Sequence, residues 1–565
     1  MSDTRGDQTL KAQLLAKECV WLLTAMFFGA LYIVSAVNPA RMDADIIVST
    51  LASLKNPTLY YWGQDRLFSL IPMMLLPFRN IEWNLYCNTF FHATFFCALI
   101  LIILRSMPGN KGNTFLLLLA VLIVLNHTIP APELFTFTKH AQPYAASTVF
   151  MFLAFFIYYS TIKHINWKRK KPICAVLVVI SLLLNPLTLM LGLGLFLAEL
   201  IASMLHSSAF SGRNMTINLR WLSILLSSFF IALLTKKIYC RNYDITATNL
   251  DFNIANFTPA LKITASRFIE SFNGNYTALG SVVFGFIICV YTCLGRRNNL
   301  IIHGRSQADI TAKQILATSA RPSFHKVISR AAIINLLTLL PIISSEWYRM
   351  NDYSLRYIFP LYLVIIIGLC MPLNYIFNLL STDLISYGAK ANNDSPRKLR
   401  NSIISLALAS CIAAISIGSY RPLVPSLMTY NDFSRVQPVY NSLLNSLYTS
   451  ENIFIGGSYW LSWPFKGLGM RDGYDIGVIT DRSRFDPVSK QRESILDNHI
   501  RMGDEFTFIC LSEDRSATNC ESFLKDKIHS NSTSPRDWKM DILGKPMYYS
   551  FNGDIYATKL QYKIP

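Results

Sequence analysis

The sequence predicts a mostly α-helical, polytopic membrane protein: a bundle of about eleven spans followed by a C-terminal α/β domain outside the cytoplasm. Of its 565 residues, 52% are hydrophobic and 15% are charged, whereas soluble proteins carry about 25% charged residues. Several apolar windows reach about 18 residues, the length that crosses a bilayer. Polarity rises sharply after about residue 420, which predicts a membrane domain over 1–419 and an α/β domain over 420–565.

The apolar windows give the spans in order. The run from Val20 to Val37 is predicted to be a span rather than a cleaved signal, because it is long and no small-x-small site follows it. The stretch 172–205 is predicted to be a hairpin of two short helices broken at Asn185–Pro186, because basic residues flank both of its ends. The predicted spans are 19–37, 83–104, 114–129, 144–162, 172–186, 187–205, 219–236, 278–295, 330–345, 357–379 and 401–419.

The distribution of charge sets the topology. A net charge of +18 would suit a nucleic-acid partner, but Lys and Arg gather in short loops between spans, as the positive-inside rule requires. No nucleic-acid partner is therefore predicted, and the N-terminus is placed in the cytoplasm. An odd number of spans then puts the C-terminal domain on the outer face, together with the loops 38–82, 130–143, 237–277 and 346–356.

The C-terminal region has a different pattern. Short β-rich runs (NIFIGGS, YDIGVIT, EFTFICL and DIYATKL) alternate with segments that suit helices, such as SKQRESILDNHIRM, which predicts a small α/β domain. Outside the cytoplasm Cys510 and Cys520 are candidates for a disulfide, the alternative being two unrelated thiols. The aromatic residues Tyr459, Trp460 and Trp463 form either a platform for sugar rings or core packing against the membrane domain.

Two aspartates, Asp43 and Asp45, follow the first span in NPARMDADIIVST. Ile47, Leu51 and Leu54 recur after them at helical spacing, which predicts an amphipathic helix on the membrane surface. Asp43 near its N-cap and Asp45 in its first turn would be favoured by the helix dipole. The aspartates are therefore either helix caps or catalytic acids.

Further along this outer loop, Gln64, Asp65 and Arg66 lie among aromatic residues. An acid, a surface helix and an arginine between aromatics suit a lipid-phosphate site. Arg66 would hold the phosphate through two N–H groups, and an acid would take the proton from an acceptor hydroxyl. The alternative for Arg66 is an interfacial anchor.

The loop before the span at 357–379 places Arg349 and Arg356 on the outer side, against the general bias of positive charge. Arg356 and Tyr357 open this span, where an outer arginine can bind an anionic head group or a ligand phosphate. The alternative for these arginines is a salt bridge to Asp352 or Glu346.

The second outer loop carries Glu133, Lys139 and His140. Charged residues beside span ends often line functional cavities, and Lys139 could pair with a phosphate. The alternative is a snorkelling lysine and an exposed histidine. No P-loop, dinucleotide fingerprint or Cys/His metal spacing is found.

Together these motifs resemble GT-C-type membrane glycosyltransferases, the class that includes protein mannosyltransferases and bacterial aminoarabinose transferases. DADIIVSTL, YYWGQDR and RYIFP carry the resemblance, which covers the architecture of about 19–380 and an outer C-terminal domain. It implies a catalytic acid in the first outer loop and a sugar donor linked to a polyprenyl phosphate.

Carried over residue by residue, Asp43 matches the catalytic acid best and Asp45 second. Arg356 and Tyr357 match the RY element that contacts the donor phosphate, and Arg66 is a weaker match. Many relatives have two adjacent acids where this chain has D-x-D, so the choice of base stays open. A D-x-D can hold a divalent metal, but many relatives with lipid-phosphate donors need none for chemistry, so no cofactor or metal site is predicted and a divalent metal at the D-x-D is the alternative.

The resemblance implies an inverting transfer of sugar from a polyprenyl phosphate to an envelope glycan, lipid or protein, at the outer face of a bacterial inner membrane. One alternative is a polymerase or ligase of lipid-linked glycans. Another is a transporter or flippase, which would need repeat symmetry and ionisable residues deep within helices, for which Glu199 is a candidate.

Overall fold

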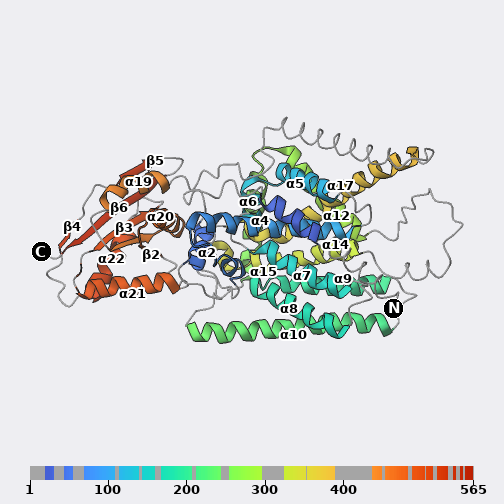
Figure 1. Ribbon diagram of the computed structural model, residues 1–565, viewed down its shortest axis with the longest axis horizontal. Coiled ribbons are helices and arrows are strands. Elements are labelled where there is room, and N and C mark those ends of the chain that lie inside the picture. The colour runs from blue at the N-terminus through green and yellow to red at the C-terminus, as the bar shows by residue number, and fades with distance from the viewer. Residues whose placement is uncertain are drawn as a thin grey trace, which may run out of the picture.

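Helices make up most of the chain that the computed structural model describes, and a six-stranded sheet lies toward the C-terminus (Figure 1). The described residues are 19–30, 44–54, 69–107, 114–138, 143–159, 167–205, 212–243, 253–294, 324–350, 353–388, 436–447, 452–480, 487–502, 504, 506–512, 518–531, 539–541, 547–550 and 554–563.

The helical part follows the apolar windows of the sequence. Within the described residues, each predicted span overlaps helical structure, and the span 401–419 lies outside those residues. The long helices are α4 (Ile81–Ser106), α5 (Thr114–Thr128), α7 (Tyr144–Tyr159), α8 (Trp167–Leu184), α9 (Thr188–Leu205), α10 (Gly212–Tyr243), α12 (Tyr276–Leu294), α14 (Phe324–Asn335) and α17 (Phe359–Gly388), with a further helix over Cys19–Ala30. Short helices connect them: α2 (Ala44–Leu54), α3 (Leu70–Met74), α6 (Ala131–Thr138), η5 (Ile254–Asn256), α11 (Phe257–Glu270), η6 (Leu336–Thr338), α15 (Leu339–Ile343), α16 (Glu346–Met350) and η7 (Leu355–Ile358).

Five helical stretches within the described residues are long and apolar enough to cross a membrane. They are Ile81–Ser106, Asn218–Tyr239, Tyr276–Leu294, Phe324–Ile343 and Leu355–Phe377. The chain is thus a mostly helical membrane protein.

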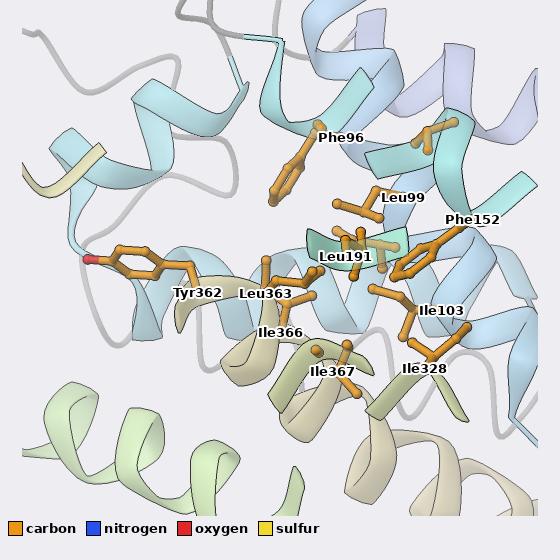
Figure 2. Packing of buried hydrophobic residues seen from close by; sticks show 14 of the residues in the cluster. Phe96, Leu99, Ile103, Phe152, Leu191, Ile328, Tyr362, Leu363, Ile366 and Ile367 are labelled. Carbon is orange, nitrogen blue, oxygen red and sulfur yellow. The ribbon is translucent and has the colours of Figure 1, made fainter. Parts of the chain in front are cut away.

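The core of the bundle lies between α4, α7, α9, α14 and α17. Figure 2 shows side chains from these helices meeting, among them Phe96, Phe152 and Ile366. In a bilayer such packing is driven by van der Waals contact, which favours small residues where helices cross. At the crossing of α12 and α17 a Cβ on Gly368 would lie 1.7 Å from the carbonyl oxygen of Gly285, so that no larger residue fits there.

The predicted break at Asn185–Pro186 is present. Helix α8 ends at Leu184 and α9 begins at Thr188, because proline cannot continue the helix and disfavours helical backbone in the residue before it. The Thr188 hydroxyl donates to the Asn185 carbonyl oxygen at 2.7 Å and closes the turn. The stretch 172–205 is therefore two helices.

Helix α2 corrects one prediction. It begins at Ala44, with Asp45 in its first turn, as the spacing indicated. It does not lie on a surface with one face exposed, however, because the residues from Ala44 to Ser53 are all buried. Helix α4 covers one side and α20 (Tyr459–Arg471), from the C-terminal region, covers another.

The β-rich runs of the C-terminal region form strands. The strands are β1 (Ile453–Gly457), β2 (Ile476–Thr480), β3 (Phe506–Ser512), β4 (Lys539–Asp541), β5 (Met547–Ser550) and β6 (Asp554–Lys563). The order is β2-β1-β3-β6-β4, with β5 also pairing with β6. Strands β1, β2 and β3 are parallel, in register Ile453 with Ile476 and Thr507, and β6 runs antiparallel to β3.

Helices cover both faces of this sheet. Alternate residues of a strand point to opposite faces. Ile453 and Ile455 accordingly pack against α19 (Val436–Leu447) and α20, whereas Phe454 packs against α21 (Pro487–Met502) and α22 (Thr518–Asn531). In Figure 1 the sheet and its helices lie beyond the end of the bundle where α2 is found.

Candidate functional site

Three segments that are far apart in the sequence meet at the first turn of α2. Asp45 Oδ2 lies 3.3 Å from Nη1 of Arg356, in η7. The hydroxyl of Tyr459, in α20, donates to Asp45 Oδ1 at 3.0 Å. Asp45 is 2% exposed and Arg356 is 9% exposed. Both oxygens of one buried carboxylate are thus engaged, one by an arginine and the other by a tyrosine.

Polar residues of α4 hold α2 in place. Asn88 Nδ2 donates to the Ile46 carbonyl oxygen at 3.3 Å and to Thr50 Oγ1 at 3.2 Å. One turn earlier, Asn84 Nδ2 donates to Ser53 Oγ at 2.7 Å. Residues four apart lie on one face of a helix, so the two asparagines form a polar stripe that fixes the position of α2 and therefore of Asp45.

Arg356 lies at the entrance of the span Leu355–Phe377. Its Nη2 donates to the Tyr357 hydroxyl at 2.9 Å, and the guanidinium lies 4.9 Å from the centre of the Tyr357 ring. The Tyr357 ring in turn packs edge-on against Tyr348, with centroids 5.9 Å apart. The arginine is therefore held by an aromatic neighbour and by a carboxylate of another helix, and a planar guanidinium can bind two oxygens of an anion such as phosphate.

Glu133 lies in α6, which packs beside η7. Its side chain is buried, and burial raises the pKa of Glu133 to about 7. Tyr362 of α17 is close enough to Glu133 for an electrostatic interaction. Within the described residues, neither Glu133 Oε2 nor the Tyr362 hydroxyl has a hydrogen-bond partner. Buried polar atoms without partners are rare, so the helix beside η7 carries a second buried polar position.

The candidate residues that were predicted from the sequence have different positions in the structure. It brings Asp45, Arg356 and Tyr357 together. Arg349 instead pairs with Glu346 within α16, in an exposed ion pair one turn apart. Asp43, Gln64, Asp65, Arg66, Lys139 and His140 lie outside the described residues.

For Tyr459 and Trp463 the structure decides between the two alternatives offered for the aromatic cluster; the side chain of Trp460 is not among those described. Tyr459 and Trp463 are buried in one hydrophobic cluster with residues of α2 and α4, which is core packing against the helical part. The partnership of Tyr459 with Asp45 was not predicted, because no local pattern connects positions 414 apart. The asparagine stripe did have a signal, since Asn84 and Asn88 are four apart within a long and mostly apolar helix.

Two further predicted features concern cysteines and metals. Cys510 is buried in β3 and forms a disulfide. The side chain of Cys520, the predicted partner, is not among those described. In the described part of the chain, no three His, Cys, Asp or Glu side chains gather so that they could hold a metal ion.

Comparison with known proteins gives matches only at the level of structure, since no family model and no curated protein matches the sequence. The crystal structure of ArnT from Cupriavidus metallidurans bound to undecaprenyl phosphate is 12% identical, with a TM-score of 0.43, covering 97% of this chain and 98% of that chain. The archaeal oligosaccharyltransferase AglB from Archaeoglobus fulgidus, in complex with an inhibitory peptide and a dolichol-phosphate, is 11% identical. Its TM-score is 0.37, and the match covers 95% of this chain and 74% of that chain.

Both matched structures are distant in sequence, at 12% and 11% identity, so the activity is inferred from the residues of this chain.

Proposed function

We propose that the protein is an inverting membrane glycosyltransferase, which moves a sugar from a polyprenyl-phosphate donor to an envelope glycan, lipid or protein. The observation that carries this proposal is the buried pair of Asp45 and Arg356 at the start of a candidate span. Charged residues at membrane depth are costly, and those that occur usually serve a ligand or a reaction.

The roles follow from the contacts. Arg356, steadied by Tyr357, holds the donor phosphate. Asp45 has both oxygens engaged, so its role is to orient Arg356, and the general base is assigned to Asp43, two residues earlier. The acceptor hydroxyl gives its proton to Asp43 as its oxygen attacks the anomeric carbon. The bond from that carbon to the phosphate oxygen breaks, and polyprenyl phosphate leaves with the electron pair.

The topology belongs to the same proposal. The chain crosses a bacterial inner membrane eleven times, with 1–419 as the membrane domain and 420–565 as an extracytoplasmic domain. The disulfide of Cys510 supports this location, because disulfides persist in oxidising compartments. Cys520 is the proposed partner of Cys510. Arg66, Lys139 and Glu133 are proposed to line the same pocket.

The phosphate site is tested by binding of undecaprenyl phosphate to the full-length protein in detergent. Arg356→Gln removes the charge and is expected to weaken binding at least about tenfold, the effect of one charge-assisted hydrogen bond. Arg356→Lys, which keeps the charge but loses the two-pronged geometry, is expected to bind with intermediate affinity. Arg349→Lys is the matched control from the same loop. Equal affinity of wild type and Arg356→Gln would refute the phosphate site.

The transfer itself is tested in a strain that lacks this gene. Mass spectrometry of envelope glycans compares complementation by wild type, by Asp43→Asn and by Asp45→Asn at matched membrane levels. The proposal expects wild type to restore one sugar and Asp43→Asn to restore none. The lost mass then identifies the sugar. Full restoration by both variants would rule out this mechanism.

A further inference from the structure

One tyrosine connects the C-terminal region to the candidate site. The Tyr459 hydroxyl donates to Asp45 Oδ1 at 3.0 Å, and Tyr459 is 5% exposed. The other oxygen of the same carboxylate contacts Arg356 at 3.3 Å. Because its two oxygens are bound by residues of two other segments, η7 and α20, the Asp45 carboxylate has little freedom to rotate.

The sheet sets the position of Tyr459. Strand β1 ends at Gly457, whose φ is +106°, and a Cβ at this residue would lie 2.1 Å from the carbonyl oxygen of Leu511 in β3. Only glycine tolerates both conditions. The next residue, Ser458, donates its N–H to the same Leu511 oxygen at 2.9 Å. Helix α20 therefore leaves the sheet in a fixed direction, with Tyr459 as its first residue.

This junction lies at the carboxyl ends of the parallel strands, where ligands usually bind in α/β sheets. In open α/β sheets, ligands bind at the carboxyl ends of parallel strands, where the strand order reverses. Here the parallel strands have the order β2-β1-β3, so the reversal falls at the end of β1. Helix α20, which follows β1, lies against α2, and the two helices lie side by side in Figure 1.

Packing does not account for the hydroxyl. The rings of Tyr459 and Trp463 pack together edge-on, with centroids 6.4 Å apart, in a cluster that includes Ile47 and Leu51 of α2. Phenylalanine would fill the same space at position 459. The oxygen atom adds a hydrogen bond to the carboxylate that pairs with Arg356.

We propose that Tyr459 is a positioning residue of the transferase site: it fixes the Asp45 carboxylate and, through it, the guanidinium of Arg356. The C-terminal region is then part of the active site and not a separate acceptor-binding module. This inference rests on the proposed role of the Asp45–Arg356 pair. A guanidinium held in place before the donor arrives binds the phosphate without the cost of ordering it.

The test compares two Tyr→Phe variants of the full-length protein. Tyr459→Phe is expected to weaken undecaprenyl phosphate binding about tenfold, the effect of losing one hydrogen bond to a charged group. The matched control is Tyr440→Phe. Tyr440 is also buried in the C-terminal region and donates to a carboxylate, Asp472, at 2.8 Å, but belongs to α19 and a different hydrophobic cluster. The control is expected to bind like wild type.

A double variant shows whether Tyr459 acts through Asp45. In an Asp45→Asn background, adding Tyr459→Phe is expected to change the affinity no further, because residues that act as one unit are not additive. Equal losses in Tyr459→Phe and Tyr440→Phe would overturn the inference, since they would reflect the stability of the region. Additive effects of the two changes would also overturn it.

The failure of the inference differs from the failure of the proposed function. If Arg356→Gln binds undecaprenyl phosphate as wild type does, the phosphate site itself is wrong and the inference falls with it. If Arg356→Gln loses binding while Tyr459→Phe keeps it, the phosphate site stands and only the positioning role of Tyr459 is refuted.

Discussion

Arg349 and Arg356 lie seven positions apart in the same predicted outer loop, yet the fold treats them differently. Arg349 is 63% exposed and pairs with Glu346, three residues earlier in the same short helix. Arg356 is 9% exposed and pairs with Asp45, 311 positions away. The sequence offered both arginines the same alternatives, a phosphate contact or a local salt bridge. Burial, which depends on distant segments, therefore decides which arginine forms an ion pair shielded from solvent.

The largest effect is expected for Arg356→Leu. This change leaves the Asp45 carboxylate buried without its cation, which costs about 3–5 kcal/mol of unfolding free energy. The thermal midpoint of the full-length protein in detergent measures the loss. Combining Arg356→Leu with Asp45→Asn removes both charges and is expected to recover part of the stability. If Arg356→Leu alone were as stable as wild type, burial would not distinguish Arg356 from Arg349.

Glu133 extends the comparison to a buried acid that keeps its proton. Burial raises the pKa of Glu133 to about 7. Between pH 4.5, the ordinary pKa of this group, and pH 7, the native state therefore holds a proton that the unfolded chain has released. The stabilising protonation is complete below pH 4.5 and is lost as the pH rises through 7. Between pH 5 and pH 8, wild type is therefore expected to lose about 2.5 kcal/mol more stability than Glu133→Gln.

Unfolding midpoints of the two proteins at pH 5 and pH 8 measure this difference. The Gln side chain keeps the shape of the acid and does not titrate, so Glu133→Gln is the control for wild type. The same pH dependence in both proteins would show that Glu133 is not the group responsible.

A smaller loss is expected when the support of α2 is weakened. Asn88→Ala removes the donor to the Ile46 carbonyl oxygen and to Thr50, at a cost of about 1–2 kcal/mol. The detergent unfolding midpoint again gives the value. Thr235→Ala is the control, because this exposed hydroxyl bonds within its own helix, to Ile231. A loss in the control as large as in Asn88→Ala would argue against a specific role for the stripe.

The smallest effect is expected for Arg349→Ala. Its ion pair with Glu346 is exposed to solvent, and such pairs contribute little because water and salt screen the charges. We expect no measurable change in the unfolding midpoint or in undecaprenyl phosphate affinity. If Arg349→Ala behaved like Arg356→Leu, the distinction between the two arginines would fail.

Local patterns predicted much of the secondary structure. Apolar windows predicted the helices because a span must satisfy its backbone within itself, so its length and composition are visible in one segment. The alternating runs became β1, β2, β3 and β6, since pleated strands show a period of two. The surroundings of α2 were predicted wrongly, because the amphipathic pattern of Ile47, Leu51 and Leu54 carries no information about α20, which covers the helix.

Residue type and short-range spacing were enough to predict the membrane character, the break at Asn185–Pro186 and the candidacy of Asp45, Arg356 and Tyr357. Three features became visible only in the folded chain: Asp45 pairs with Arg356, Arg349 stays at the surface, and Tyr459 donates to Asp45. The physical reason is that a buried charge needs a partner within hydrogen-bond distance. Which residue arrives there depends on how the bundle and the sheet pack together, and no local pattern records that packing.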